Sequence, residues 1–303
     1  IYYMARCLKG ISSNLTTVGP LKERYRYLLG GIQKARNFIF SEKYHRHREP
    51  LILKSYARQI HDKLNKITAD IIFSPSTLPV AYLEEAQPVI FWTDVTFAGI
   101  VDFYPNYIGL SSRTLRNGHL ADQKALSSAR LALFKSDWAA RTALDNYSVD
   151  KDRVKVVPFG PDLEVNPDKR EITKLIKARP DSELNLLWVG VDWMRKRGEF
   201  ALKVASQLND MGLKTSLNVI GVDKNIDRKY RSFTNVIGFL DKSRNSDRDK
   251  LIESFQKAHF LLLPTSAEAY GIVFAEASSF GVPSIATDVG GVSTAVRDGI
   301  NGK

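Results

Sequence analysis

Short apolar runs alternate with helix-forming segments along most of this 303-residue chain. The clearest run is Phe260–Leu263, which is too short to cross a membrane and is stopped by Pro264, so it predicts a buried parallel strand. Helix formers then extend from residue 272 to 280 and are followed by Gly281 and Pro283, a sequence typical of a helix C-terminus. Repeated strand–loop–helix units of this kind predict an α/β fold with parallel sheets.

The predicted strands fall into two series. The first series follows a helical stretch at about 20–70 and comprises 70–74, 88–94, 131–134 and 153–157. The second comprises 185–190, 216–221, 236–240, 260–263 and 283–287, with helices at 200–211 and 248–259. Residues 161–184 are rich in charge and have little strand pattern, so we interpret them as a linker. We therefore expect two Rossmann-like domains, residues 1–163 and 164–303, facing each other across a cleft.

The two ends and the cysteine content bear on cellular context. Residues 1–8 resemble the interior of a helix and 301–303 stop in a turn, so we expect further segments at both ends. One cysteine, Cys7, excludes an internal disulfide and fits a reducing compartment. No apolar run reaches the roughly 18–20 residues of a membrane span, and the first residues lack the regions of a signal peptide. We expect a cytoplasmic protein.

The net charge of +11 is concentrated in one region. Residues 22–66 contain 12 Lys or Arg and 4 Asp or Glu, a local charge of +8. Such a region favours anionic partners, among them lipid headgroups or a phosphorylated acceptor, and would suit peripheral contact with the inner membrane face. Nucleic acid is the least favoured of the possible anionic partners. The alternative interpretation is a solvated surface, because no ordered basic motif emerges.

Two acidic side chains and a run of cations follow predicted strands in the second half. Glu268 lies in the loop after Phe260–Leu263, and Glu276 lies in the helix that follows. Backbone N–H groups at a helix start attract phosphate, and carboxylates accept hydrogen bonds from sugar hydroxyls. Arg195, Lys196 and Arg197 follow the strand at 185–189, where cations would neutralise a diphosphate. Together these residues suggest a sugar-nucleotide site, although any one of them alone would be read as a solvated charge.

The spacing from Glu268 to Glu276 resembles the E-x7-E motif of retaining GT-B glycosyltransferases, especially glycosyltransferase family 4. Other stretches agree with that family in order and spacing: 189–198, 236–240, 281–287, and 290–291 with 298–302. The resemblance covers most of residues 86–303 and is weak before about residue 85.

The resemblance implies roles for individual residues. Glu276 would bind the ribose hydroxyls, and Glu268 would lie against the transferred sugar and stabilise positive charge at its anomeric carbon. Lys196, supported by Arg195, would bind the diphosphate and stabilise it as the leaving group. The remaining donor-binding positions implied by the family are Gly190, Gly238, Phe239, Leu240, Tyr270, Gly271 and Ile272. No metal ion or other cofactor is expected, because cations and amides would neutralise the phosphates.

The sequence departs from the family pattern at three positions. Val191 stands where many members have Arg, and Thr294 where a Glu is usual. Thr93 and Asp94 follow the strand at 88–92, where a His is often found. We therefore treat Asp94 as a catalytic candidate that would contact the sugar or the acceptor, the alternative being that it caps the following turn.

The function implied is transfer of a hexose from a UDP- or GDP-linked donor to a saccharide or lipid-linked acceptor in glycan synthesis. Alternatives are a nucleotide-sugar 2-epimerase, a phosphorylase of related fold, or a basic membrane- or nucleic-acid-binding module on a degenerate transferase. The remaining candidates favour structural or exposed roles: His45, His47, His61, His119 and Cys7. Tyr25, Leu28, Leu29 and Ile32 recur at helical spacing. We expect the stripe of Tyr25, Tyr27 and Leu28 to belong to the core rather than to an interaction surface.

Overall fold

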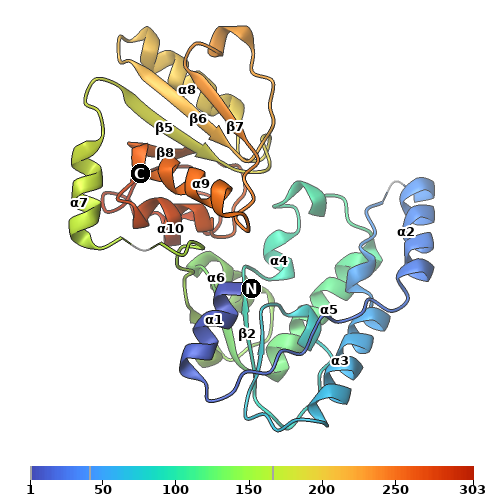
Figure 1. Cartoon of the computed structure of the whole chain (residues 1–303). Coiled ribbons are helices and arrows are strands. Elements are labelled where there is room, and N and C mark those ends of the chain that lie inside the picture. The colour runs from blue at the N-terminus through green and yellow to red at the C-terminus, as the bar shows by residue number, and fades with distance from the viewer. Residues whose placement is uncertain (1, 41, 166) are drawn as a thin grey trace. The chain divides into compact units, whose positions relative to one another are not determined.

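The computed structural model describes residues 2–40, 42–165 and 167–303. The chain divides into two compact units, Ile1–Val157 and Pro158–Lys303, each with its own parallel sheet (Figure 1). This division lies a few residues before the 163/164 boundary expected from the sequence. The mixed α/β architecture with parallel sheets confirms the predicted fold class, and each unit is described separately below.

The first unit contains a four-stranded parallel sheet in the order β1-β2-β3-β4. Its strands are β1 (Ile72–Ser74), β2 (Val89–Thr93), β3 (Ala129–Phe134) and β4 (Val154–Val156). All four overlap the segments that the sequence predicts as strands. Phe91 and Phe134 are fully buried and meet edge to face at 6.0 Å between β2 and β3.

The first unit also contains helices before and between these strands. Their bounds are α1 (Tyr2–Ile11), α2 (Arg26–Phe40), α3 (Pro50–Leu64), α4 (Phe97–Ile100), α5 (Ser112–Ser128) and α6 (Asp137–Asn146). The helical stretch predicted at about 20–70 is therefore two helices, and Pro50 opens the second at a position where proline is favoured. Among the described residues, no helix is long and apolar enough to cross a membrane.

The expected core position of the stripe on α2 is wrong. Tyr25 is 42%, Tyr27 93% and Leu28 62% exposed, whereas the neighbouring Leu29 is 4% exposed. Helical spacing shows which residues share a face, but it does not show which face meets the sheet. Here the helix buries the side that carries Leu29 and turns most of its apolar residues outward.

The second unit contains a five-stranded parallel sheet in the order β7-β6-β5-β8-β9. Its strands are β5 (Leu184–Val189), β6 (Thr215–Ile220), β7 (Thr234–Gly238), β8 (Phe260–Leu263) and β9 (Ser284–Ala286). Its helices are α7 (Lys169–Ala178), α8 (Gly198–Asp210), α9 (Asn245–Lys257), α10 (Ile272–Ser279) and α11 (Val292–Ala295). Residues 186–188 and 261–263 are buried, as expected for central strands covered on both faces.

Helix α7 corrects the interpretation of residues 161–184 as a linker. Asp168 accepts hydrogen bonds from the backbone N–H groups of Arg170 and Glu171, and the Glu171 side chain accepts one from the N–H of Asp168. This reciprocal pair is a capping box, and its spacing is visible in the sequence. The guanidinium of Arg179, just beyond the helix, donates to the carbonyl oxygens of Phe280 and Gly281, both at 2.9 Å. The helix is thus part of the second unit.

Replacing Asp168 by alanine is expected to lower the free energy of unfolding by about 1 kcal/mol, because two N–H groups at the start of α7 lose their acceptor. The urea midpoint measures this change. Asp168→Asn, which keeps a capping oxygen, should lose less. Equal stability of the alanine variant and the parent chain would show that the capping box does not stabilise α7.

Candidate functional site

The predicted site residues of the second unit gather at the carboxyl ends of its central strands. β5 pairs with β6 on one side and with β8 on the other, so the direction in which the chain builds the sheet reverses between β5 and β8. In open parallel sheets, ligands bind at such a switch point, outside the carboxyl ends of the strands. Arg195 and Lys196 follow β5, and Glu268 follows β8.

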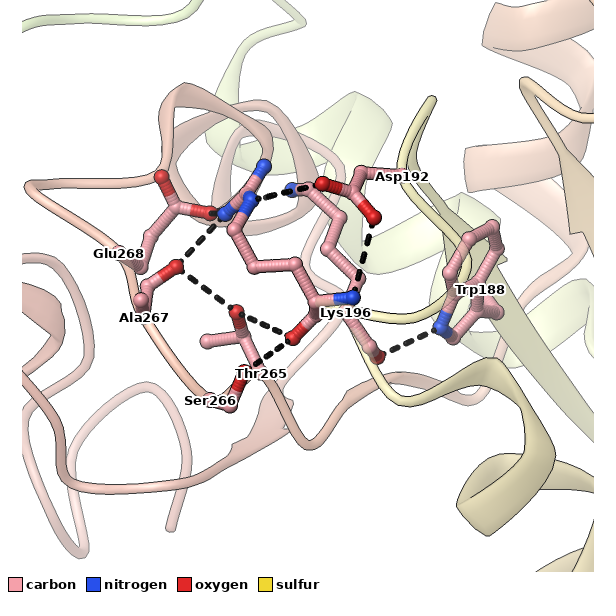
Figure 2. Close-up of polar contacts among 8 residues, drawn as sticks. Trp188, Asp192, Lys196, Thr265, Ser266, Ala267 and Glu268 are labelled. Carbon is pink, nitrogen blue, oxygen red and sulfur yellow. Dashed lines mark hydrogen bonds and ion pairs between the residues drawn. The ribbon is translucent and has the colours of Figure 1, made fainter. Parts of the chain in front are cut away.

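The loop after β5 is held in one shape by its own hydrogen bonds. The side chain of Asp192 accepts from the N–H of Arg195 at 3.0 Å, and its carbonyl oxygen accepts from the N–H of Lys196 at 3.0 Å. The buried indole of Trp188 donates to the carbonyl oxygen of Lys196 at 3.1 Å (Figure 2). Lys196 itself is only 9% exposed. Hydrogen bonds therefore hold both the N–H and the carbonyl oxygen of Lys196, and they fix the backbone that carries its side chain.

Gly190 allows the Lys196 side chain to lie across the end of β5. A Cβ atom at position 190 would come within 2.2 Å of Cδ of Lys196 and 3.3 Å of the Trp188 ring. Any larger residue would displace the lysine. The predicted contact of Gly190 with a donor remains a prediction, but its packing against Lys196 gives a separate reason for glycine here.

Glu268 lies between two cations. Its Oε2 atom is 3.2 Å from Nη1 of Arg195 and 3.2 Å from Nζ of Lys196. The three side chains are between 11% and 15% exposed, so the contact lies mostly away from water. Asp192 also contacts this cluster, with its carboxylate 3.4 Å from Nε of Arg195. The cluster thus contains two cations and two carboxylates.

The loop after β8 is tied to the loop after β5 by backbone contacts. The carbonyl oxygen of Arg195 accepts from the N–H of Ser266 at 2.8 Å and from its hydroxyl at 2.9 Å, and Arg195 Nη1 donates to the carbonyl oxygen of Ala267 at 2.6 Å (Figure 2). The carbonyl oxygen of Glu268 accepts from the N–H of Gly291 at 3.0 Å. Glu268 and the two cations are thus carried by one cross-linked pair of loops.

The start of α10 requires glycine. Gly271 precedes the helix with φ +80°, and a Cβ atom there would lie 2.5 Å from the Phe274 ring and 3.2 Å from Cγ of Glu268. Ile272 is the first helical residue, so its N–H is among those that lack an acceptor within the helix. Tyr270 is 5% exposed, and its hydroxyl donates to the carbonyl oxygen of Phe159 at 2.6 Å. Burial raises the pKa of Tyr270, so its side chain supports the loop as a neutral donor.

Glu276 lies on α10 and is 2% exposed. Its carboxylate forms an ion pair with Lys242, whose ammonium also lies 4.0 Å from Asp162. Lys242 follows β7, beyond Gly238, Phe239 and Leu240, the three residues predicted to lie along the base. We did not predict Lys242 from the sequence, although a cation soon after a strand's carboxyl end is the same signal that identified Lys196.

Replacing Lys242 by methionine is expected to lower the free energy of unfolding by about 1–3 kcal/mol, because the buried carboxylate of Glu276 loses its counter-charge. Thermal or urea unfolding measures the loss. Lys242→Arg should retain most of the stability. Lys250→Met is the matched control on the exposed surface of α9 and should behave as the parent chain. An unchanged Lys242→Met midpoint would show that the pair contributes nothing to stability.

Asp94 belongs to the first unit and also pairs with a cation. It follows β2, and its carboxylate contacts the ammonium of Lys135, which follows the neighbouring strand β3. Burial lowers the pKa of Lys135, and the negative charge of Asp94 opposes that shift. Asp94 does not cap the next helix, because Thr96 accepts the capping hydrogen bond from the N–H of Gly99. The pair thus lies at the carboxyl edge of this sheet; Lys135 was missed because only strand order brings it to Asp94.

His61 and His119 have polar partners within the first unit. His61 lies 2.8 Å from Glu85, and His119 lies 3.2 Å from the Tyr147 hydroxyl. Burial lowers the pKa of His45, and it lowers that of His47 to about 4. The part of the chain that the structure describes contains no group of three or more His, Cys, Asp or Glu side chains arranged to hold a metal ion.

The sequence of the second unit matches a known family. Residues 183–303 match the family model described as "Glycosyl transferases group 1". D-inositol 3-phosphate glycosyltransferase from Geodermatophilus obscurus is 30% identical over 175 residues, which cover 54% of this chain and 39% of that protein. The enzyme of the same name from Nocardia farcinica is 28% identical over 173 residues, covering 54% and 38%. The chain thus aligns with about two fifths of the length of these relatives.

Solved structures extend the similarity of fold to both units. WaaG, a glycosyltransferase involved in lipopolysaccharide biosynthesis, matches with a TM-score of 0.56 at 22% identity, covering 83% of this chain and 68% of that chain. HepE from Anabaena, solved in complex with UDP, matches with a TM-score of 0.58 at 16% identity, covering 81% and 66%. These glycosyltransferases have the GT-B fold, which is therefore the fold of this chain. Residues 183–303 of the second unit are thus similar to the glycosyl transferases of group 1.

Proposed function

We propose that this chain is a retaining, metal-independent glycosyltransferase that moves a hexose from a UDP- or GDP-linked donor to a saccharide or lipid-linked acceptor. In this proposal the second unit binds the donor, and the first unit, Asp94 included, binds the acceptor. The relatives support a nucleotide-sugar donor, since HepE has been solved with UDP and with UDP-glucose.

The observation that carries the proposal is the placement of Arg195 and Lys196 on either side of the Glu268 carboxylate. Breaking the bond between the anomeric carbon and the diphosphate leaves negative charge on the phosphate and positive charge on the sugar. Cations held in place before the reaction stabilise the first charge, and a carboxylate beside the sugar stabilises the second. Because the loops that carry these groups are hydrogen-bonded together, little reorganisation would accompany the reaction.

The two other parts of the proposal concern the nucleoside and the phosphates. Glu276 would accept hydrogen bonds from the ribose hydroxyls, a role suited to an ionised carboxylate. The ribose hydroxyls would either share the Glu276 carboxylate with Lys242 or displace the Lys242 ammonium from it. The N–H groups at Gly271 and Ile272 would donate to phosphate oxygens at the start of α10. Neutralisation by side chains and amides would make a metal ion unnecessary.

A thermal-shift screen of UDP- and GDP-sugars, followed by product analysis, tests the proposal. A ligand that binds only the native state raises the melting temperature, so we expect one of the sugar nucleotides to raise it by several degrees. That donor with an acceptor should give a glycoside with the anomeric configuration of the donor. Epimerisation of the donor alone, or a requirement for inorganic phosphate, would instead indicate an epimerase or a phosphorylase. The absence of any shift with both nucleotide series would contradict the proposal.

A further inference from the structure

Helix α2 turns an apolar stripe away from the first unit. Tyr27 is 93%, Leu28 62%, Phe38 90% and Ile39 67% exposed. At 3.6 residues per turn, Tyr27 and Phe38 lie three turns apart on one line, and Leu28 and Ile39 lie on the adjacent line. The exposed residues between them, Gly31 and Ala35, carry no polar side chain. The outer stripe, defined here as Tyr27, Leu28, Gly31, Ala35, Phe38 and Ile39, is therefore continuous and about 16 Å long.

The stripe is not a consequence of a poorly packed helix. The opposite side of α2 carries Leu29, which is 4% exposed, and Arg46, from the segment before α3, donates to Gln33 at 2.9 Å. Figure 1 shows α2 at the periphery of the first unit. One face of α2 is thus anchored to the protein while the other presents aromatic and aliphatic groups to solvent. Exposed apolar surfaces of this kind commonly mark an interaction site.

Cations border the outer stripe. On the helix, the exposed Lys34 lies at one edge of the stripe, and Arg36, whose charge is paired with Glu42, lies at the other, as 3.6 residues per turn places them. Lys22, Arg24 and Arg26 are exposed and precede the stripe along the chain. Of the acidic residues nearby, Glu23 pairs with Arg46 at 2.8 Å and Glu42 pairs with Arg36 at 3.2 Å, so neither is a bare negative charge. Residues 22–66 as a whole carry +8.

An apolar stripe rich in aromatic residues and bordered by lysine and arginine matches the chemistry of an anionic bilayer surface. The apolar groups suit the boundary between headgroups and acyl chains, and the cations suit lipid phosphates. A second copy of this chain could cover the apolar stripe with its own stripe. Its cations would then face the cations of the first copy and repel them. The charge pattern therefore favours lipid over self-association.

We propose that the outer stripe of α2 binds the surface of anionic membranes, with Tyr27, Leu28, Phe38 and Ile39 inserted at headgroup level and the flanking cations on lipid phosphates. This interaction does not depend on the transfer reaction. It would hold the first unit beside any acceptor carried by a lipid.

Co-sedimentation with vesicles tests the proposal. Vesicles of phosphatidylcholine containing about one third phosphatidylglycerol should bind the chain, and pure phosphatidylcholine vesicles should bind it at least about 10-fold more weakly. Binding should weaken with added salt, because the electrostatic part is screened. Tyr27→Ser combined with Phe38→Ser should lower binding to the anionic vesicles at least about 10-fold.

The control is Met211→Ser combined with Ile300→Ser, which removes apolar side chains that are 74% and 77% exposed on the second unit. This control should bind as the parent chain does. Equal binding of the Tyr27→Ser/Phe38→Ser variant and the parent would overturn the proposal, as would failure of the parent to bind anionic vesicles. A dimer in analytical ultracentrifugation that the same variant abolishes, with no vesicle binding, would assign the stripe to a second copy instead. Circular dichroism confirms that each variant is folded.

Discussion

Replacing Lys196 by methionine is expected to lower turnover about 100- to 1000-fold, with a much smaller change in the KM for the donor. Methionine fills the space over Gly190 but carries no charge, so the variant removes the ammonium 3.2 Å from Glu268 while keeping most of the packing. In the proposed reaction that ammonium stabilises the departing diphosphate, whose charge increases in the transition state. Rates of hexose transfer under donor saturation, with donor KM measured separately, test this prediction.

Lys203→Met is the matched control for Lys196→Met. Lys203 is exposed on α8, a few residues beyond the loop, and its replacement should leave turnover unchanged. Turnover of Lys196→Met within a few-fold of the parent, in a protein with parental stability, would remove Lys196 from the chemical step. A large rise in the donor KM with unchanged turnover would give Lys196 a binding role only.

Replacing Glu276 by alanine is expected to weaken binding of UDP or GDP about 100-fold. Two ribose hydroxyls that donate to a carboxylate lose their acceptor, and hydrogen bonds to charged groups contribute about 1.5–3 kcal/mol each. Glu276→Gln, which keeps one acceptor oxygen, should show an intermediate loss. Titration calorimetry with the nucleoside diphosphate measures the affinity without any acceptor.

Glu253→Gln, on the exposed side of α9, is the control for Glu276 and should bind nucleotide as the parent does. Because Glu276 pairs with Lys242, the variant's folding is checked by its unfolding midpoint. Unchanged nucleotide affinity in a folded Glu276→Ala variant would contradict the assignment of the ribose to this carboxylate.

The central strands β5 and β8 were predictable because both of their faces are largely buried. Phe260–Leu263 is apolar at every position and bounded by His259 and Pro264, and the structure places β8 at these residues. Helix α7 could also have been predicted, since the Asp168 and Glu171 spacing is a helix-start signal. Because that segment is highly charged, we interpreted it as a linker instead.

The orientation of α2 could not be predicted, because burial is decided by what packs against a helix. The apolar residues of α2 satisfy a helical pattern whether the face that carries Tyr27 or the face that carries Leu29 packs against the rest of the unit. In the structure, Leu29 is buried and Tyr27 is exposed. The sequence pattern identifies the apolar faces of a helix, but the tertiary contacts determine which face is buried.

The ion pairs of the two sites show a further limit of prediction from the sequence. Glu268 and Lys196 could be grouped because both follow strands and because their pattern resembles a family. Lys242 and Glu276, or Lys135 and Asp94, meet only because particular strands are neighbours in their sheets or because a loop reaches a helix. The sequence can mark each cation as lying near the end of a strand, but it does not show which carboxylate the cation will meet.

The central claim is that the loops after β5 and β8 bind a nucleoside diphosphate, and hydrogen exchange with and without UDP or GDP tests it most directly. We predict that the bound nucleotide slows exchange of backbone amides at 190–198 and 265–272, and that amides of α7 are unaffected. Saturating nucleotide that leaves both loops unchanged, or that protects only residues of the first unit, would contradict the account.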